Sequence, residues 1–168
     1  MKKNFLFAFL GLVLLSLVAF NLSSKKSEVT QPISTTAIKW YTLEEAIQAN
    51  KKSEKKFFID IYTDWCGWCK VMDKKTFQDP AVIKYLNENF YAVKFNAEQQ
   101  ESINFKGKEY EFMPGGRRGI HKLAYTLLDR QASYPSFVVL NTNLDRENII
   151  KGYKKPAPFL TLLGKKGL

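Results

Sequence analysis

The chain has 168 residues, of which 45% are hydrophobic and 14% aromatic, a composition that excludes a largely disordered chain. Two cysteines exclude a disulfide-rich scaffold, and a single long apolar run excludes a multi-span membrane protein. The net charge of +10 comes from short basic pairs spread among acidic and apolar residues, a pattern typical of solvated surface, so no nucleic-acid partner is expected. The remaining class is one globular domain behind an N-terminal targeting segment.

The first 22 residues have the pattern of an export signal. Lys2 and Lys3 precede an apolar stretch over residues 5–20, which as a helix would span about 24 Å, short of a ~30 Å hydrocarbon core. No small-x-small cleavage site follows, so residues 1–22 are expected to be either a signal peptide or an uncleaved membrane anchor. Residues 23–37 would then form a flexible tether and residues 38–168 the domain, which is expected to work outside the cytoplasmic membrane.

Along this domain, the sequence predicts helices that alternate with strands and then give way to a hairpin. The predicted strands are 37–41, 56–63, 90–96, 136–140 and 147–153, and the predicted helices are 66–77, 118–130, 158–163 and two that begin at Thr42 and Asp79. Thr42 and Glu45 form a capping box, and Asp79 is an N-cap followed by Pro80. This order predicts a mixed α/β fold with helices on both faces of a central sheet.

Between the strand at 90–96 and the helix at 118–130 lies a long connection. Residues 103–105 and 110–112 flank Lys106-Gly107-Lys108, which predicts a hairpin. The glycine-rich stretch 114–119 is expected to be a turn. His121 is expected on the exposed, polar side of the following helix.

The Cys66-x-x-Cys69 pair stands at the junction of a predicted buried strand and a predicted helix. A zinc site needs four ligands, and the chain offers no further cysteine and only His121. Carboxylates could complete such a site, but no metal is expected. Covalent haem attachment needs a histidine directly after the second cysteine, where Lys70 stands. A purely structural disulfide is the remaining alternative, but it would close too short a loop to restrain the unfolded chain much.

A redox role makes better use of this position. At a helix N-terminus, free amides and the helix dipole stabilise the Cys66 thiolate and lower its pKa. Cys69, one turn further along the helix, lies on the same side and can resolve a mixed disulfide. The pattern therefore indicates a dithiol catalyst with Cys66 as the attacking thiol.

Asp60 is the one acidic residue inside the otherwise apolar segment KFFIDIYT. Burial of an ionised carboxylate is costly, so its pKa is expected to rise. This makes Asp60 a candidate proton acceptor for Cys69. The alternative is a carboxylate at a frayed strand end.

With these residues together, the chain resembles the thioredoxin family over most of residues 38–163. The resemblance matches Asp60 to the buried acid of the family, Lys94 to its neighbouring lysine, and Pro135 to its cis-proline. It also covers Trp65 before the cysteine pair, Lys70 after it, and Gly152 at the end of the last strand. It implies substrate contacts at Trp65, Gly67, Trp68, Tyr134 and Pro135, and supporting roles for Lys70 and Lys94.

The chain departs from the family pattern in three places. Trp68 replaces the proline between the cysteines, a position that tunes the reduction potential in the family. Tyr134 replaces a smaller aliphatic residue before Pro135. The connection 97–119 is longer than usual and resembles insertions in exported bacterial thioredoxin-like proteins.

The resemblance implies an exported, periplasmic thiol–disulfide oxidoreductase, either soluble or tethered to the inner membrane. Its partners would be protein thiols and disulfides, with a protein electron donor or acceptor that could itself be membrane-borne. No cofactor is expected beyond the Cys66–Cys69 pair. Reductase activity is favoured, with oxidase or isomerase activity as alternatives, and the rival from another class is a redox-inactive binding or chaperone module.

Overall fold

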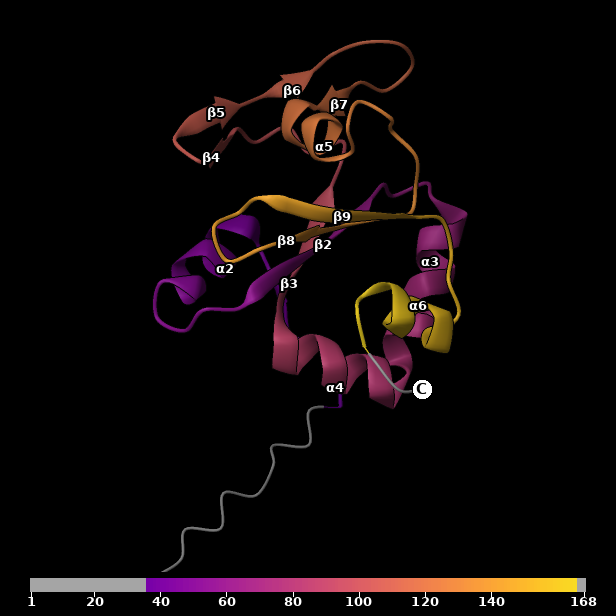
Figure 1. Ribbon diagram of the computed structural model, residues 1–168. Coiled ribbons are helices and arrows are strands. Elements are labelled where there is room, and N and C mark those ends of the chain that lie inside the picture. The colour runs from indigo at the N-terminus through magenta and orange to yellow at the C-terminus, as the bar shows by residue number, and fades with distance from the viewer. Residues whose placement is uncertain (1–35, 166–168) are drawn as a thin grey trace, which may run out of the picture. The chain divides into compact units, whose positions relative to one another are not determined.

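The computed structural model describes residues 36–165, which fold around a five-stranded mixed sheet with strand order β1-β3-β2-β8-β9 (Figure 1). The elements, in chain order, are β1 (Trp40–Tyr41), α2 (Leu43–Asn50), β2 (Lys56–Tyr62), α3 (Gly67–Lys74), α4 (Pro80–Asn89), β3 (Phe90–Asn96), β4 (Ile103–Phe105), β5 (Lys108–Tyr110), β6 (Phe112–Met113), β7 (Ile120–His121), α5 (Lys122–Leu127), β8 (Ser136–Leu140), β9 (Arg146–Lys151) and α6 (Pro156–Leu162). The predicted mixed α/β architecture is confirmed.

Strand β2 is the centre of the sheet. It pairs in parallel with β3 and antiparallel with β8, and this register places Asp60 opposite Lys94 on β3 and opposite Phe137 on β8. Residues 57–61 are all buried, as expected for a strand that is covered on both faces. Successive side chains of a strand point to opposite faces of the sheet, so Phe57, Ile59 and Ile61 lie on one face of β2. Phe58 and Asp60 lie on the other face.

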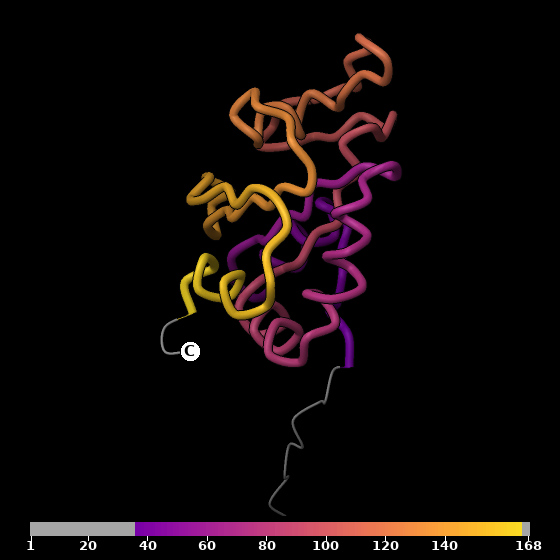
Figure 2. The backbone as a smooth tube through the Cα atoms, turned by 90° about the vertical axis from the view of Figure 1, so that its right-hand side faces the viewer, coloured from indigo at the N-terminus to yellow at the C-terminus, as the bar shows by residue number. Residues whose placement is uncertain are grey.

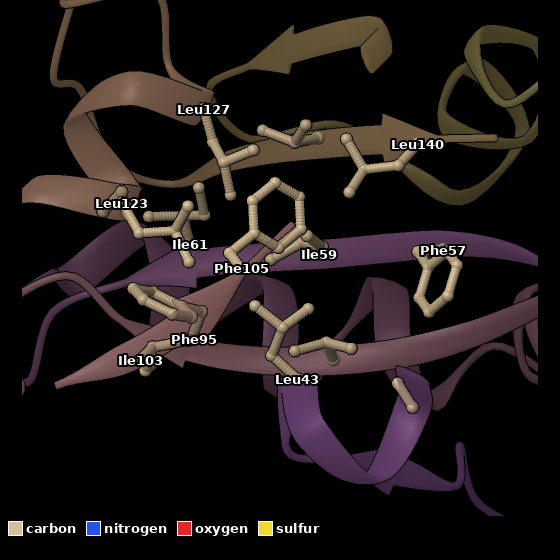
Figure 3. Close-up of a cluster of buried hydrophobic side chains, with 14 of the residues drawn as sticks. Leu43, Phe57, Ile59, Ile61, Phe95, Ile103, Phe105, Leu123, Leu127 and Leu140 are labelled. Atoms are coloured by element: carbon tan, nitrogen blue, oxygen red, sulfur yellow. The ribbon is translucent and has the colours of Figure 1, made fainter. Parts of the chain in front are cut away.

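The two faces of the sheet carry separate hydrophobic clusters. One cluster joins β2 to α2, α5 and the hairpin strand β4, and Figure 3 shows Leu43, Phe105 and Leu123 converging on Ile59 and Ile61. The other cluster joins the opposite face to α3, α4 and α6. Figure 2 shows the segment containing β4–β7 and α5 gathered at one end of the domain, away from α4 and α6.

Two predicted helix caps are present. Thr42 and Glu45 exchange the reciprocal hydrogen bonds of a capping box at the start of α2. Asp79 caps α4 by accepting from the backbone N–H groups of Ala81 and Val82, with Pro80 as the first helical residue. These local signals define where both helices begin.

Several predicted boundaries are wrong. The helix predicted over 66–77 ends at Lys74 and is followed by a separate 3₁₀ turn, Thr76–Gln78. α6 begins two residues earlier than predicted, β1 is limited to Trp40–Tyr41, and β9 spans Arg146–Lys151 instead of 147–153. After β9 the chain leaves the sheet at Gly152, where a φ of +74° ends the extended backbone.

The long connection contains the predicted hairpin, although its second strand spans Lys108–Tyr110 instead of 110–112. It also contains a second hairpin that was not predicted. In the first, Lys106 and Gly107 both have positive φ in the turn between β4 and β5. In the second, β6 pairs with β7, so the chain is extended through His121 where a helix was predicted to begin at 118. α5 is therefore only six residues long.

His121 is fully buried, which corrects the prediction that it is a surface residue. Its backbone N–H donates to the Ala97 carbonyl oxygen at 2.7 Å, and its Nδ1 accepts from the N–H of Leu123 at 3.2 Å. The other ring nitrogen, Nε2, lies 3.1 Å from the carbonyl oxygen of Glu101 and donates to it. Burial lowers the pKa of His121, so the neutral ring caps α5 and ties it to the connection.

The residues assigned to the signal or anchor (1–22) and nearly all of the tether (23–37) lie outside the described range, so both assignments remain predictions. Within residues 36–165, no helix combines the length and apolar character needed to cross a membrane.

Phe58 is the clearest single test of the α3–α4–α6 cluster. Its fully buried ring contacts those of Phe77, Phe137 and Phe159, so Phe58→Ala is expected to lower the free energy of unfolding by about 3–5 kcal/mol, measured by urea denaturation. Leu162→Ala, at a side chain that is 43% exposed, is the control and should cost at most about 1 kcal/mol. Equal losses in the two variants would contradict this assignment of the core.

Candidate active site

The chain leaves β2 and turns directly into α3, which places the cysteine pair at the start of the helix. The N–H of Cys66 donates to the Thr63 carbonyl oxygen at 3.1 Å, which closes the connecting turn. Cys66 is the N-cap of α3 and forms a disulfide with Cys69, with their Cα atoms 5.3 Å apart. The Cys69 N–H donates to the Cys66 Sγ at 3.1 Å. After reduction, this amide and the helix dipole would stabilise a Cys66 thiolate.

Exposed tryptophans border a disulfide that is itself nearly covered. Cys66 and Cys69 are 4% and 3% exposed, whereas Trp65 and Trp68 are 49% and 60% exposed. The Trp65 ring packs edge-on against Tyr134 with centroids 5.8 Å apart, and the Trp68 ring lies 5.4 Å from that of Tyr153. Such amphipathic rings are favoured contact residues at protein interfaces, so a macromolecular partner would meet them at the disulfide.

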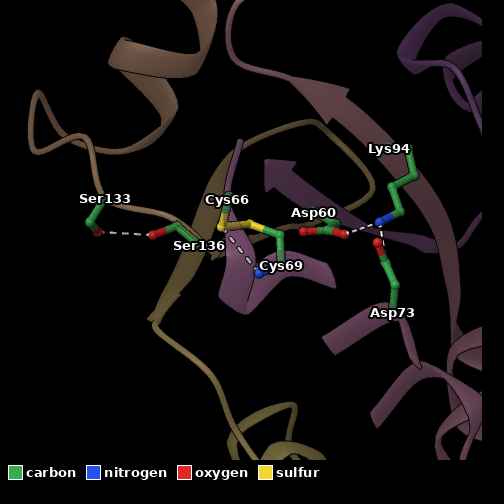
Figure 4. The surroundings of a disulfide bond; sticks show 7 residues. All are labelled: Asp60, Cys66, Cys69, Asp73, Lys94, Ser133 and Ser136. Atoms are coloured by element: carbon green, nitrogen blue, oxygen red, sulfur yellow. Dashed lines mark hydrogen bonds and ion pairs between the residues drawn. A yellow bond between two sulfur atoms is a disulfide. The ribbon is translucent and has the colours of Figure 1, made fainter. Parts of the chain in front are cut away.

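Behind the disulfide lies Asp60, which is 2% exposed. Its Oδ2 forms an ion pair with the Lys94 Nζ at 2.7 Å, and Figure 4 shows the carboxylate between that lysine and Cys69. Its Oδ1 is buried and has no hydrogen-bond partner among the described residues. Burial raises the pKa of Asp60 to about 6, against the opposing effect of the Lys94 ammonium. One carboxylate oxygen therefore remains free to accept a proton.

Lys94 binds a second carboxylate, that of Asp73 on α3 (Figure 4). Burial alone would lower the pKa of Lys94, but the two carboxylates raise it above its ordinary value, so it stays charged. With all three groups ionised the cluster would carry one net negative charge, which protonation of Asp60 removes. The Asp73 side chain is 43% exposed, so this end of the cluster reaches water. The sequence interpretation missed Asp73, although it stands four residues after Cys69 on the same helix.

On the opposite side of the disulfide is the start of β8. The Tyr134–Pro135 peptide bond is cis, as the family resemblance implied. The Pro135 carbonyl oxygen accepts from the N–H of Gly152 at 2.8 Å, which ties this loop to the end of β9. A hydrogen bond between the hydroxyls of Ser133 and Ser136, 3.1 Å apart, spans the cis bond (Figure 4).

The structure brings most of the predicted site residues together, with the exception of Lys70. Asp60, Cys66, Cys69 and Lys94 lie together (Figure 4). Trp65 directly precedes Cys66 and packs against Tyr134, which forms the cis bond to Pro135, while Gly67 and Trp68 are exposed in the first turn of α3. Lys70 is exposed and forms no ion pair within residues 36–165, so its supporting role remains a prediction. Glu98, which accepts a hydrogen bond from the Trp65 Nε1 at 2.9 Å, was not identified from the sequence.

Similarity to known proteins agrees with this geometry. Residues 20–143 match the model of the Thioredox_DsbH family, described as a protein of unknown function, DUF255. The chain belongs to this family. Two solved structures share its fold: a DsbH oxidoreductase, with a TM-score of 0.53 and 15% identity over 84% of this chain and 92% of that one, and a thioredoxin from Thermus thermophilus, with a TM-score of 0.55 and 19% identity over 74% and 83%. The fold of this Thioredox_DsbH member is therefore thioredoxin-like.

Curated relatives match this Thioredox_DsbH chain over shorter stretches. The thiol:disulfide interchange protein DsbD of Vibrio vulnificus is 38% identical over 65 residues, which are 37% of this chain and 11% of that protein. In the relatives with strong sequence similarity, the match covers only 11–12% of the relative's own length. The likeness therefore concerns one segment of much larger proteins.

The raised pKa of Asp60 predicts a pH-dependent contribution to stability. Between its ordinary value of 3.8 and about 6, the folded protein binds a proton that the unfolded chain has released, so the contribution of Asp60 to the free energy of unfolding falls as pH rises through this window. The difference in unfolding free energy between wild type and Asp60→Asn should therefore fall from about pH 4 to about pH 7 in urea titrations.

Glu88→Gln is the matched control, because Glu88 is an exposed carboxylate that pairs with Lys84. Its difference from wild type should show no such fall across the window assigned to Asp60. A difference between wild type and Asp60→Asn that does not change with pH would show that the pKa of Asp60 is not raised.

Proposed function

We propose that the chain is a thiol–disulfide oxidoreductase that exchanges its Cys66–Cys69 pair with cysteine pairs of protein substrates. One observation carries the proposal: a disulfide at the N-terminus of a helix, backed by a buried carboxylate with a free oxygen. The helix terminus favours a Cys66 thiolate, and Asp60 can take a proton from Cys69. The likeness to DsbD, whose name describes thiol:disulfide interchange, agrees with this chemistry.

In the reducing direction, the Cys66 thiolate attacks one sulfur of a substrate disulfide, and the other substrate sulfur leaves as a thiolate and is protonated. Asp60 accepts the proton of Cys69, whose thiolate then attacks the Cys66 sulfur and releases the second substrate thiol. The Cys66–Cys69 disulfide forms, and two electrons and two protons pass to the substrate. The oxidising direction is the reverse of these steps.

We favour the reducing direction, with disulfide oxidase or isomerase activity as the alternatives. A reductase without a bound cofactor needs a protein that restores the Cys66–Cys69 dithiol. We further propose that the domain acts in the periplasm, soluble or tethered to the inner membrane, as the basic and apolar pattern of residues 1–22 indicates. The electron donor would then itself be membrane-borne.

Single cysteine variants test the chemistry. Cys66→Ser should abolish reduction of a protein disulfide such as that of insulin, because it removes the attacking sulfur. Cys69→Ser should still attack but remain trapped as a mixed disulfide, visible as an adduct by mass spectrometry. If Cys66→Ser reduces insulin at the wild-type rate, the mechanism is refuted. If the double variant Cys66→Ser/Cys69→Ser keeps the biological activity of the wild type, a redox-inactive binding module is favoured instead.

The direction is tested by the reduction potential of the full chain, equilibrated against glutathione buffers. A value of roughly −270 mV, as in thioredoxin, is expected for a reductase. A value of about −120 to −180 mV would instead identify an oxidase or isomerase. The fraction of reduced Cys66–Cys69 is read by thiol alkylation and mass spectrometry.

A further inference from the structure

An open groove of about 790 Å³ lies beside the disulfide, on the side of Trp65 and Tyr134. Its far wall is the stretch Met113–Ile120 that connects β6 to β7, and α5 contributes Tyr125 to it. The groove is therefore built largely by the long connection.

The wall of the groove is held in a defined shape. The Gly119 N–H donates to the Gly115 carbonyl oxygen at 2.7 Å, which closes the turn that carries Arg117 and Arg118. Gly119 has a φ of +73°, and a Cβ at this position would lie 2.6 Å from the Met113 carbonyl oxygen. Only glycine fits this turn without displacing the backbone, so the two arginines are presented by a structured loop.

Two residues belong both to the groove and to the surroundings of the disulfide. Trp65 directly precedes Cys66, and Tyr134 directly precedes Pro135. The Arg118 guanidinium lies 5.4 Å from the centre of the Trp65 ring. A polypeptide whose cysteine reaches Cys66 would therefore bring its neighbouring residues past this groove.

The lining combines apolar surface with unpaired positive charge. Most of the lining side chains are apolar or aromatic. Within residues 36–165, neither Arg117 nor Arg118 forms an ion pair with a carboxylate. The one acidic side chain of the lining, Glu98, already accepts the hydrogen bond of Trp65. A ligand with one apolar group and one carboxylate would match both features.

We propose that this groove binds an extended segment of the protein substrate, next to the reacting cysteine, that carries a large apolar side chain and a carboxylate. The apolar side chain would lie between Trp65 and the wall at Met113, and Arg117 and Arg118 would bind the carboxylate. The inference rests on the proposed oxidoreductase function and specifies its substrate class. A small thiol without an apolar side chain would use only part of the surface.

The test uses synthetic peptides that carry one cysteine as a mixed disulfide with thionitrobenzoate, whose release is followed by absorbance. A Phe-Glu pair is placed either before or after the cysteine, and the matched peptides carry Phe-Lys or Gly-Glu instead. With the reduced full chain, the better of the two Phe-Glu peptides should react about tenfold faster than its Phe-Lys counterpart, the effect of one arginine–carboxylate bond. The same Phe-Glu peptide should also react faster than its Gly-Glu counterpart.

Arg117→Gln/Arg118→Gln should reduce the preference for Phe-Glu over Phe-Lys to about twofold or less. The control variant Lys51→Gln/Lys52→Gln removes the same charge from the turn after α2 and should keep the preference. An unchanged preference in the arginine variant, or none in the wild type, would overturn the proposal. An equal loss of rate with hydroxyethyl disulfide in the arginine variant would also overturn the proposal, because this small disulfide has neither a carboxylate nor a large apolar group.

A binding measurement separates this proposal from the oxidoreductase function. Fluorescence anisotropy of a labelled Phe-Glu peptide with serine in place of cysteine should show binding to the disulfide form and loss of binding in the arginine variant. Binding without any disulfide exchange would refute the redox function and leave the groove as a peptide site. Equal exchange rates for all peptides, without binding, would refute the groove and leave the redox function in place.

Discussion

The ion pair between Asp60 and Lys94 is the interaction on which the site depends. Asp60 is buried in the middle of the central strand, where an ionised carboxylate is costly unless an opposite charge lies within reach. The parallel register of β2 and β3 supplies this charge by placing Lys94 directly opposite. A slip of one residue would turn Asp60 to the face of α2 and α5, away from both Lys94 and the disulfide. The pairing of these strands therefore sets the protonation chemistry behind Cys69.

The charge balance of this cluster explains why the pKa of Asp60 is raised. Lys94 is shared by two carboxylates, of which Asp73 is 43% exposed and therefore stays solvated. The cost of desolvation then falls mainly on Asp60, which is buried and keeps one oxygen without a partner. A group with a pKa of about 6 releases and accepts a proton near neutral pH, which suits the transfer of the Cys69 proton.

The local signals in the sequence predicted much of the fold and the reacting residues. The apolar run KFFIDIYT, the capping box at Thr42, and Asp79 followed by Pro80 each act through neighbours in the chain, and the structure contains all three elements. Asp60 and Lys94 were paired by resemblance, and the register of the sheet places them in contact. For the strand and the two helix caps, short-range patterns carried enough information, whereas the contact between Asp60 and Lys94 was implied only by the family resemblance.

The sequence prediction failed where long-range partners decide the conformation. The apolar stripe after residue 118 fits a helix, but the backbone of His121 bonds to Ala97 and β7 pairs with β6, so the chain is extended there. The same partners bury His121, whose polar ring gave no sign of burial in the sequence. The groove likewise depends on how residues 113–120 fold back towards Trp65, and no local pattern encodes that contact.

The central sheet separates the residues of the proposed redox chemistry from the segment that builds the proposed substrate groove. Asp60, Lys94 and α3 lie with the cluster on one face, whereas β4 and α5 pack through the cluster on the other. Changes in the loop that carries Arg117 and Arg118 therefore leave the packing around Asp60 intact. Trp65 and Tyr134 connect the two regions, because each stands next to a residue of the disulfide site and also lines the groove. In this arrangement the connection could vary to suit different protein segments while the cysteine pair keeps its protonation environment.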